Sequence, residues 1–527
     1  MPDSAIEPRP LTPFEGMDIR SLIDAQVARR VSHPFLIWEP FEGPGQQWSY
    51  AEFGHVVRSF AAGLQARGVT PGDRVIVHLE NSPESVIAWL GTAYAGAVPV
   101  TTNAKSTQDE LAYFAAHSRA VGAVTQPRFA TLLAAAAPHL AWLAVTASDS
   151  GEAAGALAHG FDRFDAIAAD PDRLVARPHD PWAPFGIQYT SGTTARPKAV
   201  LWSHANALWG GRLSAYHENL RADDVHLVHL PLFHTNAQVY SLLASLWAGA
   251  TVVLMPRFSA SRFWPLSLKH RATWTSVVPF CVKALIEQPV PPAHHYRLWG
   301  NAVCAPPTDA HFGVRTIGWW GMTETVTHGT VGVHDGVDAP LSIGRPSPGY
   351  RIHVLGDDGC PMRPGETGDL LVGGVRGLSL FQEYADDPAA TAAAFRPDGL
   401  FITGDRVRLG GDGSLFFADR SKDMLKVGGE NVAASEIERV IAAVPGVAEV
   451  AVVGMPHPMF DEVPAAFVIA SDADNVQVRI DAACAASLAP FKRPHLVRLV
   501  DHLPRSTLEK VAKAELRAQL LALPAEV

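Results

Sequence analysis

The chain has 527 residues, of which 47% are hydrophobic, and a formal net charge of −10. A chain of this length and apolar content can bury a large core and is expected to fold as two or more domains. The modest negative charge argues against nucleic acid as a partner, because a polyanion would have to be held by a few local donors rather than by a basic surface.

The first third of the chain alternates between segments with helical and strand-like periodicity. Residues 52–67 have a helical period and end at Gly68, residues 74–78 are typical of a strand, and residues 83–95 form a second helical segment. This alternation predicts an open α/β sheet that is covered by helices on both faces.

Residues 189–200 have the sequence YTSGTTARPKAV and follow an apolar stretch at 182–187. Backbone N–H groups, hydroxyls and one ammonium in this segment can donate to phosphate oxygens, and none of them adds negative charge. The predicted nucleotide-phosphate donors are Thr190, Ser191, Gly192, Thr193, Thr194 and Lys198. The segment lacks the Gly-Lys-Ser/Thr of kinase and GTPase loops and the glycine spacing of dinucleotide folds. On this segment alone, a Ser/Thr-rich surface turn is the structural alternative.

No segment predicts export or a membrane span. The N-terminus has neither a basic start nor an apolar core, and the four cysteines are widely spaced, which fits a reducing cytoplasm better than disulfides or zinc. The uncharged stretches 129–148 and 225–256 are interrupted by proline, histidine and amide residues. Within the second stretch, residues 241–247 predict a helix that stops at Gly249 and leads into a buried parallel strand at 251–254.

After about residue 341 the pattern changes to short β-rich pieces separated by glycine turns. We expect strands within residues 350–355, 369–372 and 414–418. Beyond Lys422 a small α+β domain is predicted, with helices at 434–443 and 511–521 and strands at 447–453 and 465–470. The predicted division is therefore a large domain at 1–421, with a β-rich part from about 341, and a small domain at 422–527.

Six further motifs follow the phosphate loop in a fixed order: PLFH at 231–234, GWWGMTET at 318–325, FITGD at 401–405, DRSKDMLKVGGEN at 419–431, EIE at 436–438 and LPRSTLEK at 503–510. With these motifs the chain resembles the adenylate-forming superfamily of acyl-CoA ligases, luciferases and peptide-synthetase adenylation domains. The resemblance implies a large N-terminal domain of layered α/β sheets with a β-barrel-like subdomain, and a small mobile α+β C-terminal domain.

The resemblance also implies a role for each motif in the attack of a carboxylate on the α-phosphate of ATP. Glu324 matches the residue that helps to hold Mg²⁺, and Thr323 beside it lies near the α-phosphate. Asp405 matches the carboxylate that accepts both ribose hydroxyls, and Arg420 the cation next to ribose and phosphate. Lys510 would bridge the substrate carboxylate and the α-phosphate.

Other positions are implied to form the walls of the nucleotide and acyl pockets. Trp320 would pack on adenine, although burial in the core is an equal alternative for a tryptophan. The remaining implied wall residues are Gly300, Asn301, Ala302, Trp319, Gly321 and Met322. His234 would face the substrate carboxylate or the entering thiol, and His226 and His229 lack the further ligands that a zinc site needs.

For thioester formation, the resemblance implies that the small domain turns about Lys422, so that Lys510 leaves the site and Lys426 approaches it. Gly428 and Gly429 would then border the channel for pantetheine, because glycine allows close backbone approach. The implied cofactors are ATP (or acyl-AMP), Mg²⁺ and coenzyme A, and the implied partner is a small carboxylic acid.

Three positions depart from the family pattern: Ala195 and Ala199 replace glycines, and Glu509 replaces the glycine before Lys510. A Cβ at Ala195 is costly if that position needs a positive φ. One alternative is therefore a ligase that only forms thioesters from a preformed acyl-adenylate. A luciferase-like oxygenase, a peptide-synthetase domain and an idle nucleotide-binding protein are further alternatives. The sequence favours a full acyl-CoA ligase, leaves aliphatic, aromatic and carnitine-like acids unranked, and leaves a homodimer open.

Overall fold

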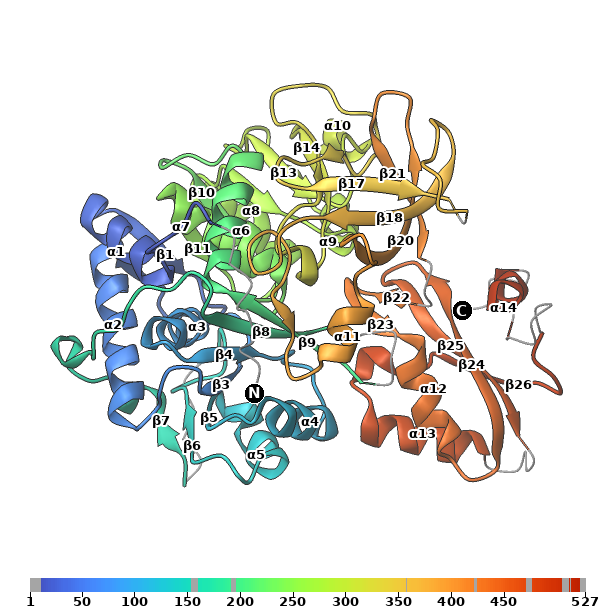
Figure 1. The fold of residues 1–527 in the computed structure, drawn as a ribbon, viewed down its shortest axis with the longest axis horizontal. Coiled ribbons are helices and arrows are strands. Elements are labelled where there is room, and N and C mark those ends of the chain that lie inside the picture. Colours follow the sequence, from blue (N-terminus) through green and yellow to red (C-terminus); the bar gives the residue numbers. More distant parts are fainter. Residues whose placement is uncertain are drawn as a thin grey trace, which may run out of the picture.

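The structure is a computed structural model that describes residues 11–152, 160–190, 196–356, 358–420, 424–470, 476–504, 511 and 513–521. Figure 1 shows two unequal lobes, with the small domain (residues 424–521) in orange and red at the right. The predicted hinge residue Lys422 lies outside the described residues, so the division at 421/422 stays a prediction.

The first large sheet has eight strands, most of them parallel. Its strand order is β19 (Glu383–Tyr384), β9 (Lys198–Ser203), β8 (Pro184–Thr190), β4 (Val98–Thr101), β3 (Arg74–His78), β5 (Gly122–Thr125), β6 (Trp142–Val145) and β7 (Asp162–Arg163). The antiparallel pair β8–β9 carries the two ends of the predicted phosphate loop, so the loop connects neighbouring strands at one edge of the parallel region.

The second large sheet has nine strands and carries the GWWGMTET motif. Its order is β16 (Arg345–Pro346), β15 (Thr330–Val331), β14 (Thr316–Trp320), β13 (Leu298–Asn301), β12 (Trp274–Ser276), β10 (Val225–Val228), β11 (Thr251–Leu254), β1 (Pro34–Trp38) and β2 (Gln46–Ser49). The six strands from β14 to β1 in this order are parallel to one another, and β11 confirms the buried parallel strand predicted at residues 251–254.

Helices fill the space between the two sheets and cover their outer faces (Figure 1). They are α1 (Ile19–Arg29), α2 (Tyr50–Ala66), α3 (Pro83–Ala95), α4 (Gln108–Ser118), α5 (Pro127–Ala136), α6 (His204–His217), the π-helix η3 (Asn236–Leu243), α7 (Ala244–Ala248), α8 (Ala260–Lys269), α9 (Pro279–Ile286), α10 (Thr308–Phe312) and α11 (Pro388–Ala393), with 3₁₀ turns η1 (Phe164–Ile167), η2 (Pro171–Arg173) and η4 (Thr323–Thr325).

Strand β3 shows how successive side chains divide between two cores. Val75 and Val77 belong to the main core, which also contains side chains of α2, α3 and the second sheet. Ile76 points the other way and packs with side chains of α4 and α5. The prediction of a sheet covered on both faces is therefore confirmed.

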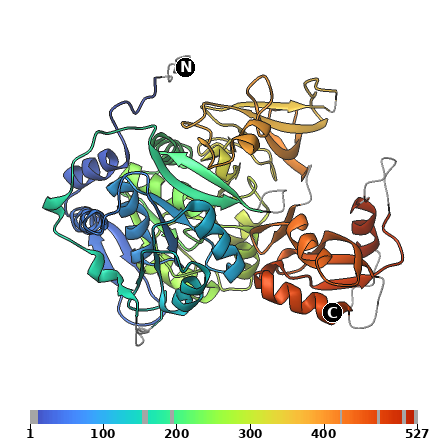
Figure 2. The ribbon, with the colours of Figure 1, turned by 60° about the horizontal axis from the view of Figure 1, so that its bottom comes forward.

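The β-rich part is an antiparallel sheet of β17 (Arg351–Leu355), β18 (Thr367–Gly373), β20 (Phe401–Leu409) and β21 (Leu415–Arg420). In Figure 1 it lies above the small domain, and Figure 2 shows it as a separate layer beside that domain. Strand β20 carries the FITGD motif into the region between the lobes.

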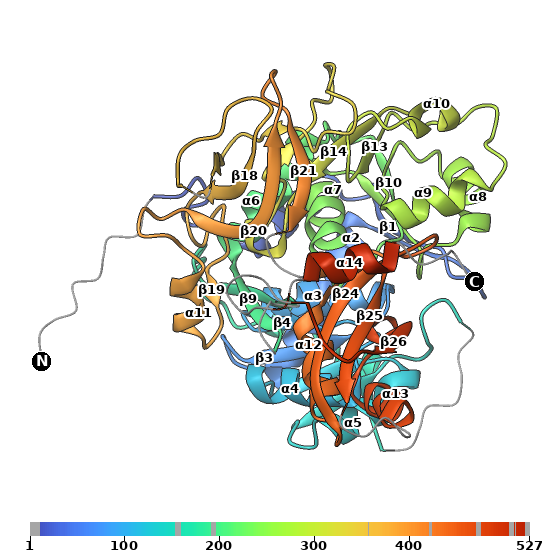
Figure 3. The same ribbon diagram turned by 90° about the vertical axis from the view of Figure 1, so that its right-hand side faces the viewer.

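The small domain contains a sheet of β23 (Glu430–Ala433), β22 (Met424–Val427), β25 (Asp461–Ala470), β24 (Val447–His457) and β26 (Leu496–Leu499), with helices α12 (Ala434–Ala442), α13 (Val476–Ser487) and α14 (Lys513–Leu521) and the turn η5 (Pro490–Lys492). Val452 faces α12 and α13, whereas Ala451 and Val453 face α14. Figure 3 shows α14 lying across β24. The predicted small α+β domain is confirmed.

Two element boundaries differ from the sequence-based expectation. The segment expected to become helical at residue 241 is already helical from Asn236, as the wide helix η3. The final helix begins at Lys513 rather than at residue 511. Gln238, one of the amide residues that interrupt the uncharged stretch, lies inside η3, where its amide is buried and hydrogen-bonded to Gln188 and to the carbonyl of Leu232.

Candidate active site

Strands β8 and β9 hold the two ends of the phosphate loop next to each other. Thr190 ends β8 and pairs with Lys198, the first residue of β9. The Lys198 ammonium lies 4.5 Å from the centre of the Tyr384 ring in a cation–π contact. The predicted loop donors Ser191, Gly192, Thr193 and Thr194 lie outside the described residues. The structure therefore fixes the loop's base and one of its cations.

Ala199, one of the departures from the family pattern, lies inside β9. It is buried, pairs with Tyr189 and accepts a hydrogen bond from the backbone N–H of Ala385. Ala199 is absent from the described non-glycine residues with positive φ, so its Cβ causes no backbone strain. Ala195 and Glu509 lie outside the described residues.

Glu324 lies in the turn η4 directly after β14 and is buried. The hydroxyl of Tyr384 donates a 2.9 Å hydrogen bond to Glu324 Oε1. Burial raises the pKa of Glu324, and the Tyr384 hydrogen bond and the Lys198 charge offset part of this rise. Thr323 Oγ1 accepts a 3.2 Å hydrogen bond from Thr235. A carboxylate, a hydroxyl and a lysine thus converge beside the phosphate loop.

Trp320 ends β14 and reaches the β-rich sheet. Its indole Nε1 donates a 2.8 Å hydrogen bond to Asp405 Oδ2 on β20. The structure therefore joins two predicted residues that stand far apart in the sequence. Gly329 lies against the Trp320 ring, since an added Cβ there would be 2.7 Å from Cζ3.

Trp319 precedes Trp320 in β14 and points to the opposite face of the strand. Its ring stacks on His328 with a centroid distance of 4.3 Å and contacts Tyr240 edge-on at 5.6 Å. Gly300 on β13 leaves room for this ring, because a Cβ at Gly300 would lie 1.7 Å from Trp319 Cη2. Trp320 therefore contacts Asp405 on one face of β14, and Trp319 contacts Tyr240 of η3 on the other face.

The other predicted wall residues frame the end of β14. A Cβ at Gly321 would lie 2.5 Å from the Tyr240 hydroxyl, and the Met322 backbone N–H donates to Thr325 Oγ1 at 2.9 Å. The Asn301 side chain is buried and accepts a 2.7 Å hydrogen bond from the Ala302 backbone. Asn301, which pairs with Gly318, therefore lies beside the motif that contains Gly321 and Met322.

His234 lies just before η3 and pairs with a residue of the small domain. Its Nε2 is 2.9 Å from Glu430 Oε2, and Asn103 Nδ2 donates to the same oxygen at 3.3 Å. Burial alone would lower the pKa of His234, but the charge and hydrogen bond of Glu430 outweigh it, so this pKa is raised. For Glu430 the charge of His234 likewise outweighs burial, and its pKa is lowered.

The loop between β22 and β23 brings the small domain to this site. Gly428 and Gly429 both have positive φ, at 58° and 86°. A Cβ at Gly429 would lie 3.9 Å from Val278 of the large domain. Lys426 is exposed on β22, and its backbone N–H donates to Glu462. The side chain of Arg420 and all of Lys510 lie outside the described residues.

Lys492 of the small domain forms a second link between the domains. Its ammonium contacts Glu110 of α4 and lies 2.9 Å from Glu436 of α12. The three side chains retain only 7–10% of their exposure. Burial would lower the pKa of Lys492, but the two carboxylates raise it, so the ammonium stays charged.

Sequence reasoning missed Tyr384, Glu430 and Lys492. Glu430 stands inside the 419–431 motif, and its position between two glycines and an asparagine was the available signal. Tyr384 and Lys492 stand in segments without a motif. Their roles depend on β19 joining β9 and on the position of the small domain, which local patterns do not encode.

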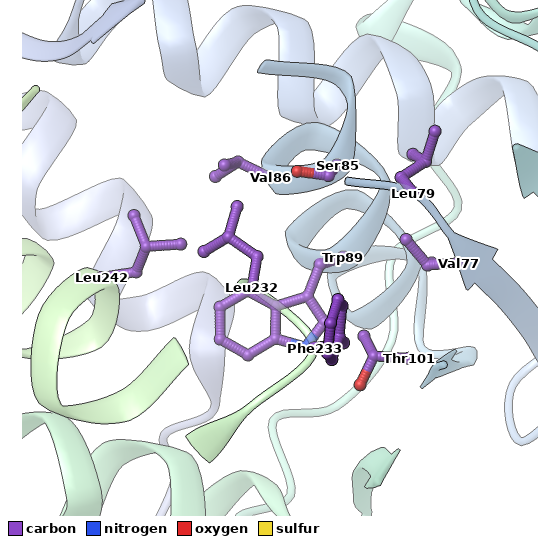
Figure 4. Close-up of a pocket in the computed structure, with 9 residues that line it drawn as sticks. All are labelled: Val77, Leu79, Ser85, Val86, Trp89, Thr101, Leu232, Phe233 and Leu242. Carbon is purple, nitrogen blue, oxygen red and sulfur yellow. The ribbon is translucent and has the colours of Figure 1, made fainter. Parts of the chain in front are cut away.

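A small apolar pocket lies between α3, β3 and the segment that leads from Leu232 into η3 (Figure 4). Its polar atoms are few, and Phe233, which lines it, packs against the His234 ring at a centroid distance of 4.7 Å. The labelled lining residues are Val77, Leu79, Ser85, Val86, Trp89, Thr101, Leu232, Phe233 and Leu242. The lining side chains pack against the start of the η3 segment, and none of them is charged.

The described ranges contain neither a metal-binding cluster nor a helix that could span a membrane. In these ranges no group of three or more His, Cys, Asp or Glu side chains is arranged to hold a metal ion. Within the same ranges, each helix is too short or too polar to cross a lipid bilayer.

Comparison with protein families finds two matches that together span most of the chain. Residues 23–385 match the AMP-binding enzyme family, and residues 436–510 match the AMP-binding enzyme C-terminal domain. Among curated proteins, the crotonobetaine/carnitine–CoA ligase of Salmonella paratyphi B is 32% identical over 519 residues, which cover 95% of this chain and 99% of that protein.

Two solved structures of o-succinylbenzoate CoA synthetase from Bacillus subtilis also match. A double mutant bound to the product analogue OSB-NCoA has a TM-score of 0.82 and 25% identity, covering 95% of this chain and 98% of that one. The enzyme in complex with AMP has a TM-score of 0.67 and 26% identity, with the same two coverages.

Proposed function

Because this chain belongs to the family of AMP-binding enzymes and is an acyl-CoA ligase that works through an acyl-adenylate, we propose that Mg²⁺ accompanies the ATP at Glu324 and that CoA enters beside His234. In the first step a carboxylate oxygen of the acid attacks the α-phosphorus and pyrophosphate leaves. In the second step the CoA sulfur attacks the acyl carbon and AMP leaves, as the thiol proton is lost.

The observation that carries the proposal is the convergence of Glu324, Lys198 and Asp405 around the end of β14. Lys198 lies at the base of the phosphate loop, where its ammonium would offset phosphate charge. Asp405 is held by the Trp320 indole and can accept hydrogen bonds from ribose hydroxyls. The nucleotide would therefore extend from the β-rich sheet to the base of the phosphate loop.

The residues around Glu324 fit Mg²⁺. The ion prefers oxygen ligands, and Glu324 supplies a buried carboxylate close to where the phosphates would lie. Burial raises the pKa of this carboxyl, and a divalent cation would favour its charged form. When bound, the ion would polarise phosphate oxygens and offset the charge that develops on them.

The position of the small domain supports CoA as the acyl acceptor. The same enzyme from Bacillus subtilis superposes with a TM-score of 0.82 when it holds a CoA product analogue and 0.67 when it holds AMP. The contacts of Glu430 with His234 and of Gly429 with Val278 belong to this arrangement. We therefore assign the described conformation to thioester formation.

The acid remains to be identified by experiment, and the curated relatives suggest where to begin. Several of them are named crotonobetaine/carnitine–CoA ligases, so these two acids are the first to test. Aliphatic and aromatic acids of similar length complete the panel.

The decisive experiment measures the two half-reactions separately. Acid-dependent pyrophosphate exchange reports adenylation, and synthetic acyl-adenylates with CoA report thioester formation. We expect both from the wild-type protein, with exchange lost on removal of Mg²⁺. Lys510→Ala should abolish exchange and spare thioester formation from a supplied adenylate.

Each contrary result corrects a distinct part of the proposal. Exchange that persists with full rate in EDTA would remove Mg²⁺ from it. Thioester formation without any acid-dependent exchange would make the protein a ligase of preformed adenylates. Equal loss of both steps in Lys510→Ala would contradict the assignment of separate conformations to the two steps.

A further inference from the structure

A buried carboxyl without a partner lies near the acyl side of β14. Glu218 directly follows α6 and is completely inaccessible to solvent. Among the described residues, neither of its side-chain oxygens has a hydrogen-bond partner. An unpaired buried carboxyl costs free energy, so its retention calls for a ligand or for a role that offsets this cost.

The neighbours of Glu218 are neutral and mostly aromatic. His328 Nε2 lies 3.9 Å from Glu218 Oε1, too far for a hydrogen bond, and His328 Nδ1 is 3.3 Å from His217 Nδ1. Burial lowers the pKa of both histidines, so neither supplies a positive charge. The Tyr240 ring packs on His328 with a centroid distance of 4.1 Å.

These side chains lie beyond the reacting centre on the Trp319 side of β14. The segment that leads into η3 starts at the reacting centre, because Thr235 is hydrogen-bonded to Thr323. About one helical turn later η3 places Tyr240 against Trp319 and His328. A Cβ at residue 321 would lie 2.5 Å from the Tyr240 hydroxyl, so the glycine there leaves room for this hydroxyl next to the end of β14.

Two glycines of α6 allow this helix to pack closely against η3. Gly210 and Gly211 lie on α6, about two turns before Glu218. A Cβ at Gly210 would lie 2.5 Å from Val239 and 3.0 Å from Val326. Both glycines therefore bring α6, which Glu218 directly follows, close to η3, which carries Tyr240.

The composition of the cluster selects the chemistry of its ligand. A carboxylate in a buried site requires a positive charge, and no described residue supplies one. The surrounding rings of Tyr240, Trp319 and His328 offer π-faces rather than the several acceptors that a primary ammonium needs. Aromatic rings around an anionic group are the usual environment for alkylated ammonium ions.

We infer that Glu218 is the specificity-determining residue of the acyl site and that it receives an alkylated ammonium group at the far end of the acid. This inference rests on the proposed function, because it assigns the substrate class of the same site. The acid would enter with its carboxylate toward Thr323 and its cationic end toward Glu218, with Trp319 and Tyr240 beside it.

The test compares two acids of nearly equal shape. One is 4-(trimethylammonio)butanoate, and the other is 5,5-dimethylhexanoate, in which a carbon replaces the charged nitrogen. We expect wild-type kcat/KM in pyrophosphate exchange to favour the cationic acid at least about tenfold. Equal rates, or preference for the neutral acid, would overturn the inference.

Glu218→Gln should lower this selectivity ratio by about tenfold or more, because the amide retains the shape and loses the charge. Glu84→Gln is the matched control, since Glu84 on α3 is another carboxyl whose pKa is raised by burial. An unchanged ratio in Glu218→Gln, or an equal fall in Glu84→Gln, would overturn the assignment of Glu218.

A binding measurement on the wild-type protein is independent of catalysis and of any variant. Burial raises the pKa of Glu218 well above its usual range, so the free carboxyl is protonated. Calorimetry in two buffers of different ionisation enthalpy should show release of about one proton with the cationic acid and none with the neutral acid. Binding without that difference would overturn the inference. Proton release in a protein that catalyses no exchange would retain it and contradict the proposed function instead.

Discussion

The hydrogen bond between Trp320 and Asp405 connects residues of two motifs that stand 85 positions apart. It holds the carboxylate of β20 against the end of β14. Such a contact orients a binding group in advance, so less ordering is required when the ligand binds. Both residues were selected from the sequence, but their direct contact was not.

Asp405→Asn tests the role of the carboxylate. The amide oxygen can still accept from the Trp320 indole, whereas the charge-assisted acceptor for ribose is lost, so ATP affinity should fall about 10- to 100-fold. Calorimetric titration with ATP measures this. Trp320→Phe is the paired control, because it removes the indole donor and keeps the carboxylate. A larger loss in Trp320→Phe than in Asp405→Asn would contradict the assignment.

The ion pair of His234 and Glu430 predicts a pH dependence of thioester formation. Glu430 raises the pKa of His234 above its usual value of 6.5. The ion pair is therefore fully formed below pH 6.5 and is lost as the pH rises through the raised pKa. Toward acid, the pair persists until the lowered pKa of Glu430 is reached, below 4.5. The His234 side chain retains 42% of its exposure, so salt should weaken the contact.

Glu430→Gln should move the alkaline limit of thioester formation to lower pH, because burial alone lowers the pKa of His234. Rates from a supplied acyl-adenylate and CoA between pH 5 and about 9 provide the profile. Adenylation measured over the same range is the control. A thioester profile that is unchanged in Glu430→Gln would show that the contact does not contribute to this step.

At the scale of elements, the close packing of β13 against β14 depends on a missing side chain. Gly300→Ala would place a methyl group inside the Trp319 ring and force that ring away from His328. We expect a loss of about 1–3 kcal/mol in the free energy of unfolding and reduced adenylation. Urea denaturation monitored by tryptophan fluorescence measures the first effect.

Gly411→Ala is the matched control for this substitution, since a Cβ there would meet no atom within 4 Å and its φ is not positive. Its unfolding free energy should change by no more than about 0.5 kcal/mol. Equal effects of the two substitutions would mean that the general cost of alanine, and not the Trp319 ring, explains the loss.

Elements with clear local signals were predictable from the sequence. Helix α3 matches residues 83–95 because Ser82 caps its start, Pro83 opens it and Gly96 ends it in the left-handed conformation. Strand β3 matches residues 74–78 because its signal is also local: a short run of apolar, β-branched residues.

Elements and sites that depend on distant partners were not predictable. The start of η3 was hidden because the polar side chain of Gln238 is satisfied by buried groups of other strands. Glu218 gave no signal, because its burial depends on His328 and Tyr240, which other elements supply. The site residues named by resemblance come from separate elements, and only the fold shows which of them lie in contact, as Trp320 and Asp405 do.

At the scale of the whole molecule, Lys492 links the two domains through buried carboxylates. Lys492→Met would leave Glu110 and Glu436 facing each other without a cation, so the described arrangement should lose about 3–5 kcal/mol. Thioester formation from a supplied adenylate should slow, and adenylation should be retained. The two half-reactions, measured side by side, test this.

Lys283→Met is the matched control, because Lys283 forms a more exposed link to Asp461 at 2.9 Å. A substitution at such a surface pair should change the domain equilibrium by less than about 1 kcal/mol. Comparable slowing in both variants, or loss of adenylation in Lys492→Met, would contradict a specific role for the buried link.

The described hydrophobic clusters of the small domain contain no residue of the large domain, and the links between the lobes are mainly polar. Rotation of one domain relative to the other would therefore expose little apolar surface to water. A reorientation of this kind has almost no heat-capacity signature, because that quantity follows exposed apolar area. The enthalpy difference between the two catalytic poses should consequently be nearly constant with temperature, so that a van 't Hoff plot of their balance is close to a straight line, while the balance itself remains sensitive to ionic strength.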